Sequence, residues 1–175
     1  EVNQVMNITD IEDKIIEKAK KKKKKIGEIT RPYIKLFFED LEKLNIEKAE
    51  KYPLATDHIK EIIGQINVLM TKEFAYTVED DGVYLDLSQA DHYRKLSGRT
   101  SEGAEDAVSR IDDSSKKRNK GDFCLWKKSK DDEPKWKDPW FSGGRPGWHI
   151  EDTAISEKYL GQQYDIHGGA RDLIF

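Results

Sequence analysis

The C-terminal part of the chain holds the residues best suited to chemistry. Residues 144–175 read GRPGWHIEDTAISEKYLGQQYDIHGGARDLIF and include two of the four histidines, His149 and His167. Two carboxylates, Glu151 and Asp152, follow His149 closely. Polar side chains beside glycine-rich turns are how an open α/β sheet builds a ligand site at its strand ends. We therefore place the candidate site in this segment.

One part of the candidate site is the run His167-Gly168-Gly169, with Asp172 just beyond it. Because glycine has no Cβ, the backbone of this turn can approach a ligand closely. The alternative is an ordinary turn at the end of a strand. The Asp172 carboxylate can accept a hydrogen bond from a ribose hydroxyl or an ammonium, or it can cap a helix.

The other part of the candidate site is Trp148 with its neighbours. Trp148 directly follows Pro146-Gly147, a position where a tryptophan either packs in the core or lines a pocket. We interpret His149 as a structural histidine that bonds to the backbone, rather than as a proton-transfer group.

Short strands and one helix are expected to position these side chains. Residues 148–150 and 164–166 are strand-like runs that each lead into polar or glycine-rich residues. Asp152 and Thr153 can cap a helix over residues 154–160, which Gly161 would end.

The N-terminal part indicates a strand end over residues 2–6, followed by a helix. Thr9 and Glu12 have the spacing of a capping box, which predicts a helix start near Asp10. The helix would run into a lysine run, Lys20–Lys25. These lysines form either a solvated helix end that complements the helix dipole or a contact for the phosphate backbone of RNA.

The middle of the chain changes from helical to strand periodicity. Apolar residues recur at helical spacing over 30–44 and again after Thr56 to residue 69. Alternating apolar residues over 74–87, with a turn at Asp81-Gly82, predict a β-hairpin. Residues 88–120 are polar and irregular, residues 123–126 are a short apolar run, and residues 129–137 resemble a linker.

Composition limits the class of protein. Of the 175 residues, 36% are hydrophobic and 37% are charged, and the net charge is −3, so bulk charge does not indicate nucleic-acid binding. A single cysteine, Cys124, excludes an internal disulfide framework and favours the cytoplasm. No apolar run approaches the roughly 20 residues of a membrane span. The first residue is not methionine, so we expect a fragment of a longer protein.

Four segments together resemble the class I cysteinyl-tRNA synthetase family. GRPGWHIE (144–151) and YDIHGGARDLIF (164–175) are similar to the second half of its catalytic domain, and NITDIEDKII (7–16) to the first half. KRNKGDFCLWK (117–127) resembles part of the insertion between the halves. The resemblance implies an α/β fold, a Rossmann-type catalytic domain that is incomplete here and carries an inserted, hairpin-containing subdomain. The expected division is 1–72 for the first half, 73–140 for the insertion and 141–175 for the second half.

The resemblance also implies site residues and substrates. Thr9, Trp148 and Asp152 would bind cysteine. The residues on the ATP side would be His167, Gly168, Gly169 and Asp172. ATP would enter with magnesium, and the acceptor of the full-length protein would be tRNA(Cys). The related ligase that joins cysteine to an amino-sugar, and a non-catalytic binding protein derived from the synthetase, are the alternatives.

Zinc is the doubtful component of this resemblance. The family binds zinc through two cysteines, a histidine and a glutamate, and one of those cysteine positions is Asp152 here. A carboxylate can bind zinc through oxygen, but zinc prefers soft sulfur ligands. We expect no tightly bound zinc in these 175 residues. The family's HIGH and KMSKS motifs have no match in them either, so we expect the isolated chain to be inactive.

The resemblance makes one geometric prediction. Thr9 and Trp148 should lie on neighbouring strands of one parallel sheet, and Asp152 should lie close to both on the wall of the cysteine pocket.

Overall fold

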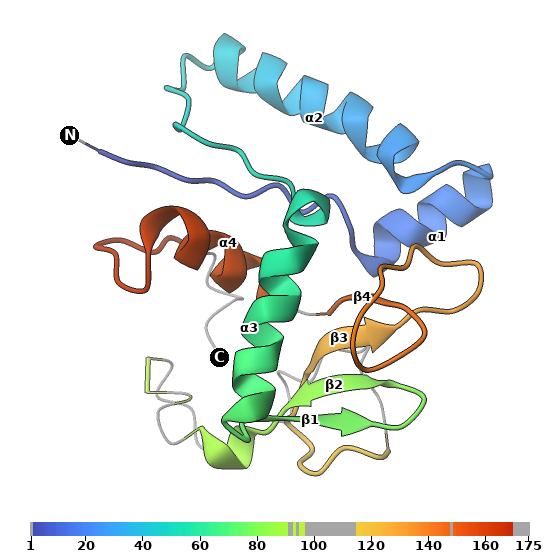
Figure 1. The fold of residues 1–175 in the computed structure, drawn as a ribbon. Coiled ribbons are helices and arrows are strands. Elements are labelled where there is room, and N and C mark those ends of the chain that lie inside the picture. Colours follow the sequence, from blue (N-terminus) through green and yellow to red (C-terminus); the bar gives the residue numbers. More distant parts are fainter. Residues whose placement is uncertain (1, 91–92, 94, 97–114, 148, 170–175) are drawn as a thin grey trace.

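The computed structural model describes residues 2–90, 93, 95–96, 115–147 and 149–169. Helices fill most of the N-terminal half, a small sheet follows, and one helix ends the described chain (Figure 1). The helices are α1 (Asp13–Lys22), α2 (Ile26–Lys43), α3 (Ile59–Thr71) and α4 (Ile150–Leu160), with short 3-10 helices η1 (Ala55–His58) and η2 (Leu87–Gln89). The strands are β1 (Ala75–Val78), β2 (Gly82–Leu85), β3 (Cys124–Lys128) and β4 (Gly144–Pro146).

The four strands form one antiparallel sheet in the order β1-β2-β3-β4. The β1–β2 hairpin confirms the expectation from the alternating residues, with Tyr76 opposite Tyr84. Trp126 of β3 lies opposite Val83, and a register shift after Val83 places Cys124 opposite Tyr84. Strand β4 extends the sheet at its far edge, where Arg145 lies opposite Lys127. The sheet therefore joins the hairpin to the residues just before the candidate site.

Helix α3 lies between the sheet and α4 and supplies the centre of the core (Figure 1). Ile62 and Ile66 have no exposed surface, as their helical spacing predicts. They pack with Trp126 from the sheet and with Ile150 and Ala154 from α4. Burying one such isoleucine side chain stabilises the fold by about 1.5–3 kcal/mol. The first turn of α4 is therefore held firmly by the core.

The N-terminal segment is extended for longer than the sequence indicates. Residues 5–8 pair in parallel with residues 51–54 through bridges Val5–Lys51 and Ile8–Leu54. The chain stays extended at Glu12, with φ −161° and ψ 170°, so α1 begins at Asp13 rather than near Asp10. The predicted Thr9 cap is wrong, because the extended pairing and a buried contact of Asp10 hold this stretch out of the helix.

Two predicted strands and two helix starts are also wrong. Residue Ile150 begins α4, which excludes both a strand over 148–150 and the predicted cap at Asp152 and Thr153 with a helix start at residue 154. Residues 164–166 lie in no strand. The strand in this region is β4, which begins four residues before the predicted one. Helix α2 begins at Ile26, four residues before the expected start. The residues that precede α4 form an edge strand because two glycines let β4 approach β3 closely.

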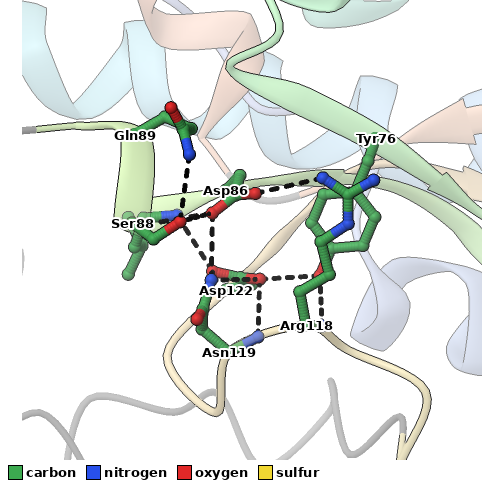
Figure 2. A network of polar contacts seen from close by, with 8 residues as sticks. Tyr76, Asp86, Ser88, Gln89, Arg118, Asn119 and Asp122 are labelled. Carbon is green, nitrogen blue, oxygen red and sulfur yellow. Dashed lines mark hydrogen bonds and ion pairs between the residues drawn. The ribbon is translucent and has the colours of Figure 1, made fainter.

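A buried polar network fastens residues 118–122 to the hairpin (Figure 2). The Tyr76 hydroxyl donates to Asp122 at 2.6 Å and accepts the backbone N–H of Arg118 at 2.8 Å. The Asn119 side chain donates to Asp86 at 2.9 Å and to Asp122 at 3.2 Å. Arg118 also pairs with Asp86 at 3.2 Å. Asp86 and Asp122 are almost fully buried, so these donors compensate for removing the two carboxylates from water.

No helix of the described residues is both long enough and apolar enough to cross a membrane.

Candidate functional site

The candidate site forms where the N-terminal segment meets the first turn of α4. The Asn7 side-chain amide donates to Asp152 Oδ1 at 2.7 Å, across 145 positions of sequence. Asn7 is fixed by its segment, because the N–H groups of its neighbours Met6 and Ile8 donate to Lys51 and Pro53. Asp152 is fixed by the packing of α4. The structure therefore brings together the segments that carry NITDIEDKII and GRPGWHIE.

His149 holds the second oxygen of Asp152. It precedes α4 with φ 54°, a left-handed conformation that is uncommon outside glycine, asparagine and aspartate. This conformation turns the imidazole back over the helix start, and its Nδ1 lies 2.9 Å from Asp152 Oδ2. The hydrogen bond and negative charge of Asp152 raise the pKa of His149 above its ordinary value. Asp152 is thus engaged by a protein group at each of its two oxygens.

Glu151 is the least satisfied carboxylate of the site. Its side chain is only 6% exposed, and its Oε2 has no hydrogen-bond partner among the described residues. Burial, and secondarily the charge of Asp152, raise the pKa of Glu151 to about 7. Burying a carboxylate without partners is costly, so near neutral pH this group binds a proton readily.

Two neighbouring polar groups support the site structurally. Asp10 is buried and accepts hydrogen bonds from the Thr56 N–H at 2.9 Å and from the Thr56 hydroxyl at 2.5 Å. His58 is also buried, with Nδ1 2.7 Å from the Leu54 carbonyl and Nε2 2.9 Å from the Tyr159 hydroxyl. Both ring nitrogens of His58 are therefore engaged, and the Nε2 contact joins η1 to α4.

Arg145 connects α1 to the sheet beneath the site. It is 5% exposed and forms ion pairs with Asp13 at the start of α1 and with Glu133, whose Oε2 lies 3.3 Å from Nε. The charge of Arg145 lowers the pKa of Glu133 against the opposing effect of burial. This pairing fixes α1, and hence the N-terminal segment, relative to β4.

The residues predicted for the cysteine side are partly located. Asp152 lies beside the predicted N-terminal segment, in which Thr9 is exposed two positions after Asn7. Trp148 lies outside the described residues, so its expected position beside Thr9 stays a prediction. The predicted parallel sheet is wrong for Thr9, which lies in no strand, because the sheet of the described residues is antiparallel and consists of β1 to β4. Asn7 was not singled out from the sequence, and Glu151 was named only as one of the two carboxylates that follow His149, without a role of its own. Their place in two motif-like segments was the available signal, but the contact itself depends on tertiary pairing.

The residues predicted for the ATP side lie at the end of the described chain. His167 is exposed, and its Nδ1 lies 3.1 Å from the Tyr164 hydroxyl. Gly168 and Gly169 are exposed too, and Asp172 lies outside the described residues. A Cβ added at Gly168 would meet no atom within 4 Å, and its φ is not positive. Neither packing within the described residues nor backbone conformation explains glycine at position 168.

Three side chains of the site could each offer a ligand atom to a cation. One atom each from His149, Glu151 and Asp152 lies within 4.8 Å of the others. A structural zinc site needs four ligands in a tetrahedron, and zinc favours sulfur and nitrogen. Here His149 and Asn7 already engage both oxygens of Asp152. The three side chains, as arranged, do not fit a closed zinc site.

A separate open pocket of about 450 Å³ lies at the turn between β1 and β2. Its lining is Thr77, Glu79, Asp80, Lys128, Trp140, Phe141 and Ser142. It contains none of the residues that the sequence predicts for the site. We take the Asn7–Asp152 region as the candidate site, because its polar groups converge and one of them is buried without a partner.

The chain matches one protein family along its entire length. Residues 1–175 fit the family described as tRNA synthetases class I (C) catalytic domain.

Curated relatives agree with this match. The chain is 52% identical to a cysteine–tRNA ligase of Methanococcus maripaludis over 99% of the chain and 36% of that relative. It is 49% identical to a cysteine–tRNA ligase of Pelagibacter ubique, over 99% of the chain and 38% of the relative. A cysteine–tRNA ligase of Pyrococcus furiosus is 47% identical over 98% of the chain and 35% of its own length. The chain therefore spans little more than a third of these relatives.

Proposed function

Because the chain belongs to the family of class I (C) tRNA synthetase catalytic domains, we propose that the full-length protein activates cysteine with ATP and ligates it to tRNA(Cys). The parent reaction has two steps. The cysteine carboxylate attacks the α-phosphate of ATP and releases pyrophosphate, and the adenylate then passes its acyl group to a ribose hydroxyl of the tRNA. The α/β fold class expected from the sequence agrees with the family.

One observation carries the proposal beyond the family match. The hydrogen bond of 2.7 Å between Asn7 and Asp152 joins the two segments whose motifs resemble the synthetase. A pocket for a small amino acid needs such convergence, because the chemistry relies on positioning and charge stabilisation more than on protein acids and bases.

We assign the cysteine side of the site to Thr9, Trp148 and Asp152. Asp152 supports this role through its charge and its place beside the N-terminal segment. His149 is a positioning residue in this proposal, because its contact with Asp152 fixes the orientation of that carboxylate.

We assign the ATP side to His167, Gly168, Gly169 and Asp172, with magnesium accompanying ATP. The support is the open surface at Gly168, where no neighbouring atom of the described residues requires glycine. A bare backbone there leaves room for the close approach of a nucleotide.

Zinc has no step in this proposal. In the family a zinc ion binds the thiolate of the substrate cysteine, and zinc prefers sulfur ligands. Asp152 offers oxygen instead, and both of its oxygens are engaged by Asn7 and His149. We propose that the protein acts in the cytoplasm, which the single cysteine of the chain favours.

Aminoacylation tests the proposed reaction. The full-length protein is incubated with labelled cysteine, ATP and magnesium, and with either tRNA(Cys) or an amino-sugar acceptor. Transfer of label to the tRNA alone supports the proposal. Transfer to the amino-sugar alone would identify the related ligase, and transfer to neither would favour a non-catalytic protein.

A further inference from the structure

The lysine run Lys20–Lys25 covers the last turn of α1 and the connection to α2, and it is exposed along its whole length. Six consecutive positive charges are unusual in a chain whose net charge is −3. Helix α1 holds the run rigidly, since Ile16 and Ala19 are buried and Lys20 pairs with Asp132 at 2.9 Å. Beyond Lys20, the ammonium groups of Lys21–Lys24 make no hydrogen bond or ion pair with the described residues.

Helix dipoles account for only part of this run. Lys20, Lys21 and Lys22 lie in the last turn of α1, where a cation interacts favourably with the helix carbonyls. Lys23 to Lys25 follow that helix and directly precede the N-terminus of α2. A positive charge is disfavoured at a helix N-terminus, and neighbouring lysines repel one another. An external anion would offset both effects.

An exposed aromatic side chain lies beside these lysines. Tyr33 on α2 is 56% exposed, and Lys18 donates to its hydroxyl at 2.6 Å. The hydrogen bond from Lys18 lowers the pKa of Tyr33, and the charges of Lys18 and, to a smaller extent, Lys22 act in the same direction. Basic side chains around an accessible aromatic ring are typical of surfaces that contact single-stranded nucleic acid, where bases stack and phosphates pair.

We propose that Lys21–Lys25 and Tyr33 form a contact surface for the RNA backbone, which we name the lysine patch. Its position suits an RNA whose end enters the candidate site. Helix α1 has ten residues and so spans about 15 Å, and it connects the N-terminal segment of the site to the lysine patch (Figure 1). The choice of tRNA as that RNA rests on the proposed function, whereas the recognition of phosphates does not.

The structure favours RNA over an anionic membrane. Helices that bind membrane surfaces present large apolar residues beside their lysines. Here the apolar side chains of α1 that lie next to the run, Ile16 and Ala19, are buried in the protein. No apolar residue interrupts Lys20–Lys25.

Salt-dependent binding of tRNA(Cys) to the full-length protein tests the lysine patch. The triple variant Lys21→Gln, Lys22→Gln and Lys24→Gln removes three exposed charges. The matched control, Lys48→Gln, Lys60→Gln and Lys72→Gln, removes three exposed lysines elsewhere. Each lost phosphate contact reduces the slope of log K against log salt by about 0.7–0.9. The magnitude of this slope should therefore be smaller by roughly 2 for the patch variant than for the wild type. The slope of the control should equal that of the wild type.

Further arms separate the possible outcomes. Lysine-to-arginine changes at the same three positions should retain the wild-type slope, and Tyr33→Ala should weaken binding several-fold without changing the slope. Equal slopes for the patch variant and its control would overturn the proposal. The proposal would also be overturned if the patch variant lost binding to phosphatidylserine vesicles but bound tRNA as tightly as the wild type does.

Cysteine-dependent pyrophosphate exchange without tRNA distinguishes a failure of the patch from a failure of the proposed function. The patch variant should show wild-type exchange, because its lysines lie outside the cysteine site. If the wild type showed no exchange, the proposed reaction would be wrong. The RNA contact would still be decided by comparing the salt slopes of the patch variant and its control.

Discussion

Asn7 donates a hydrogen bond of 2.7 Å to Asp152, although the two residues are 145 positions apart. The bond joins an extended N-terminal segment to the first turn of α4. Since the acceptor is a carboxylate, the bond is charge-assisted and stronger than a bond between neutral groups. Together with the ion pair between Arg145 and Asp13, it links the N-terminal segment to the residues around the start of α4.

Removal of this bond should weaken cysteine activation. Asn7→Ala should lower kcat/KM for cysteine by about tenfold, since a hydrogen bond to a charged group contributes about 1.5 kcal/mol or more. Asn3→Ala in the same segment is the control, because Asn3 is exposed. Kinetics of Asn7→Ala, Asp152→Ala and the double variant give the coupling energy. Additive effects of the two changes would show that the bond has no role in the reaction.

Gly144 should not tolerate a side chain. A Cβ at this position would lie 2.2 Å from Trp126 Nε1 and 2.7 Å from the Lys127 carbonyl. Gly144→Ala should destabilise the fold by about 1–3 kcal/mol or more, because Trp126 is fully buried and cannot move aside. Gly64→Ala is the matched control. Position 64 of α3 has open space around it, so alanine should stabilise the helix by up to about 1 kcal/mol. Urea unfolding compares the two variants, and equal stability of both would contradict the geometry of β4.

The phenol of Tyr76 should contribute to stability through the network in Figure 2. Tyr76→Phe leaves the buried Asp122 without one donor and the Arg118 N–H without its acceptor. The expected loss is about 1–3 kcal/mol in the free energy of unfolding. Tyr33→Phe makes the same chemical change at an exposed ring and should have little effect. A Tyr76→Phe variant as stable as wild type would mean that the network is not required to hold this loop.

Glu151 should make stability fall as pH rises. Its folded pKa of about 7 lies above the ordinary 4.5, so the folded state binds the proton more tightly than the unfolded state. The group therefore stabilises the fold fully below about pH 4.5, and this contribution is lost as pH rises toward 7. One pKa unit corresponds to about 1.4 kcal/mol, so the loss is on the order of 3 kcal/mol.

Glu151→Gln should remove this pH dependence, because glutamine does not titrate. The exposed Glu157 of the same helix provides the control, and Glu157→Gln should keep the wild-type dependence. Unfolding curves between pH 4.5 and 8 measure both. An unchanged slope in Glu151→Gln would show that this carboxyl is not the group responsible.

The sequence was sufficient where the signal was local. The apolar face of α3 and the alternation of β1 and β2 predicted these elements, because their side chains repeat with the period of the structure they form. The motif-like segments likewise indicated the family and the neighbourhood of Asp152. These predictions needed no knowledge of distant contacts.

The sequence failed where distant contacts decide local structure. The start of α1 depends on pairing with residues 51–54 and on the bond between Asp10 and Thr56. The strand predicted over 148–150 became a helix start, because His149 adopts a left-handed conformation and bonds to Asp152. Asn7 was not recognisable as a site residue, because only the folded chain brings α4 next to it.

Exchange of labelled pyrophosphate into ATP is the most direct test of cysteine activation by this site. The full-length protein should show exchange that depends on cysteine, and Asp152→Ala should reduce it strongly while leaving the fold intact. Exchange with serine should be far weaker in the wild type. Exchange that is independent of cysteine, or that is unaffected by Asp152→Ala, would contradict the assignment of the cysteine site to the Asn7–Asp152 region.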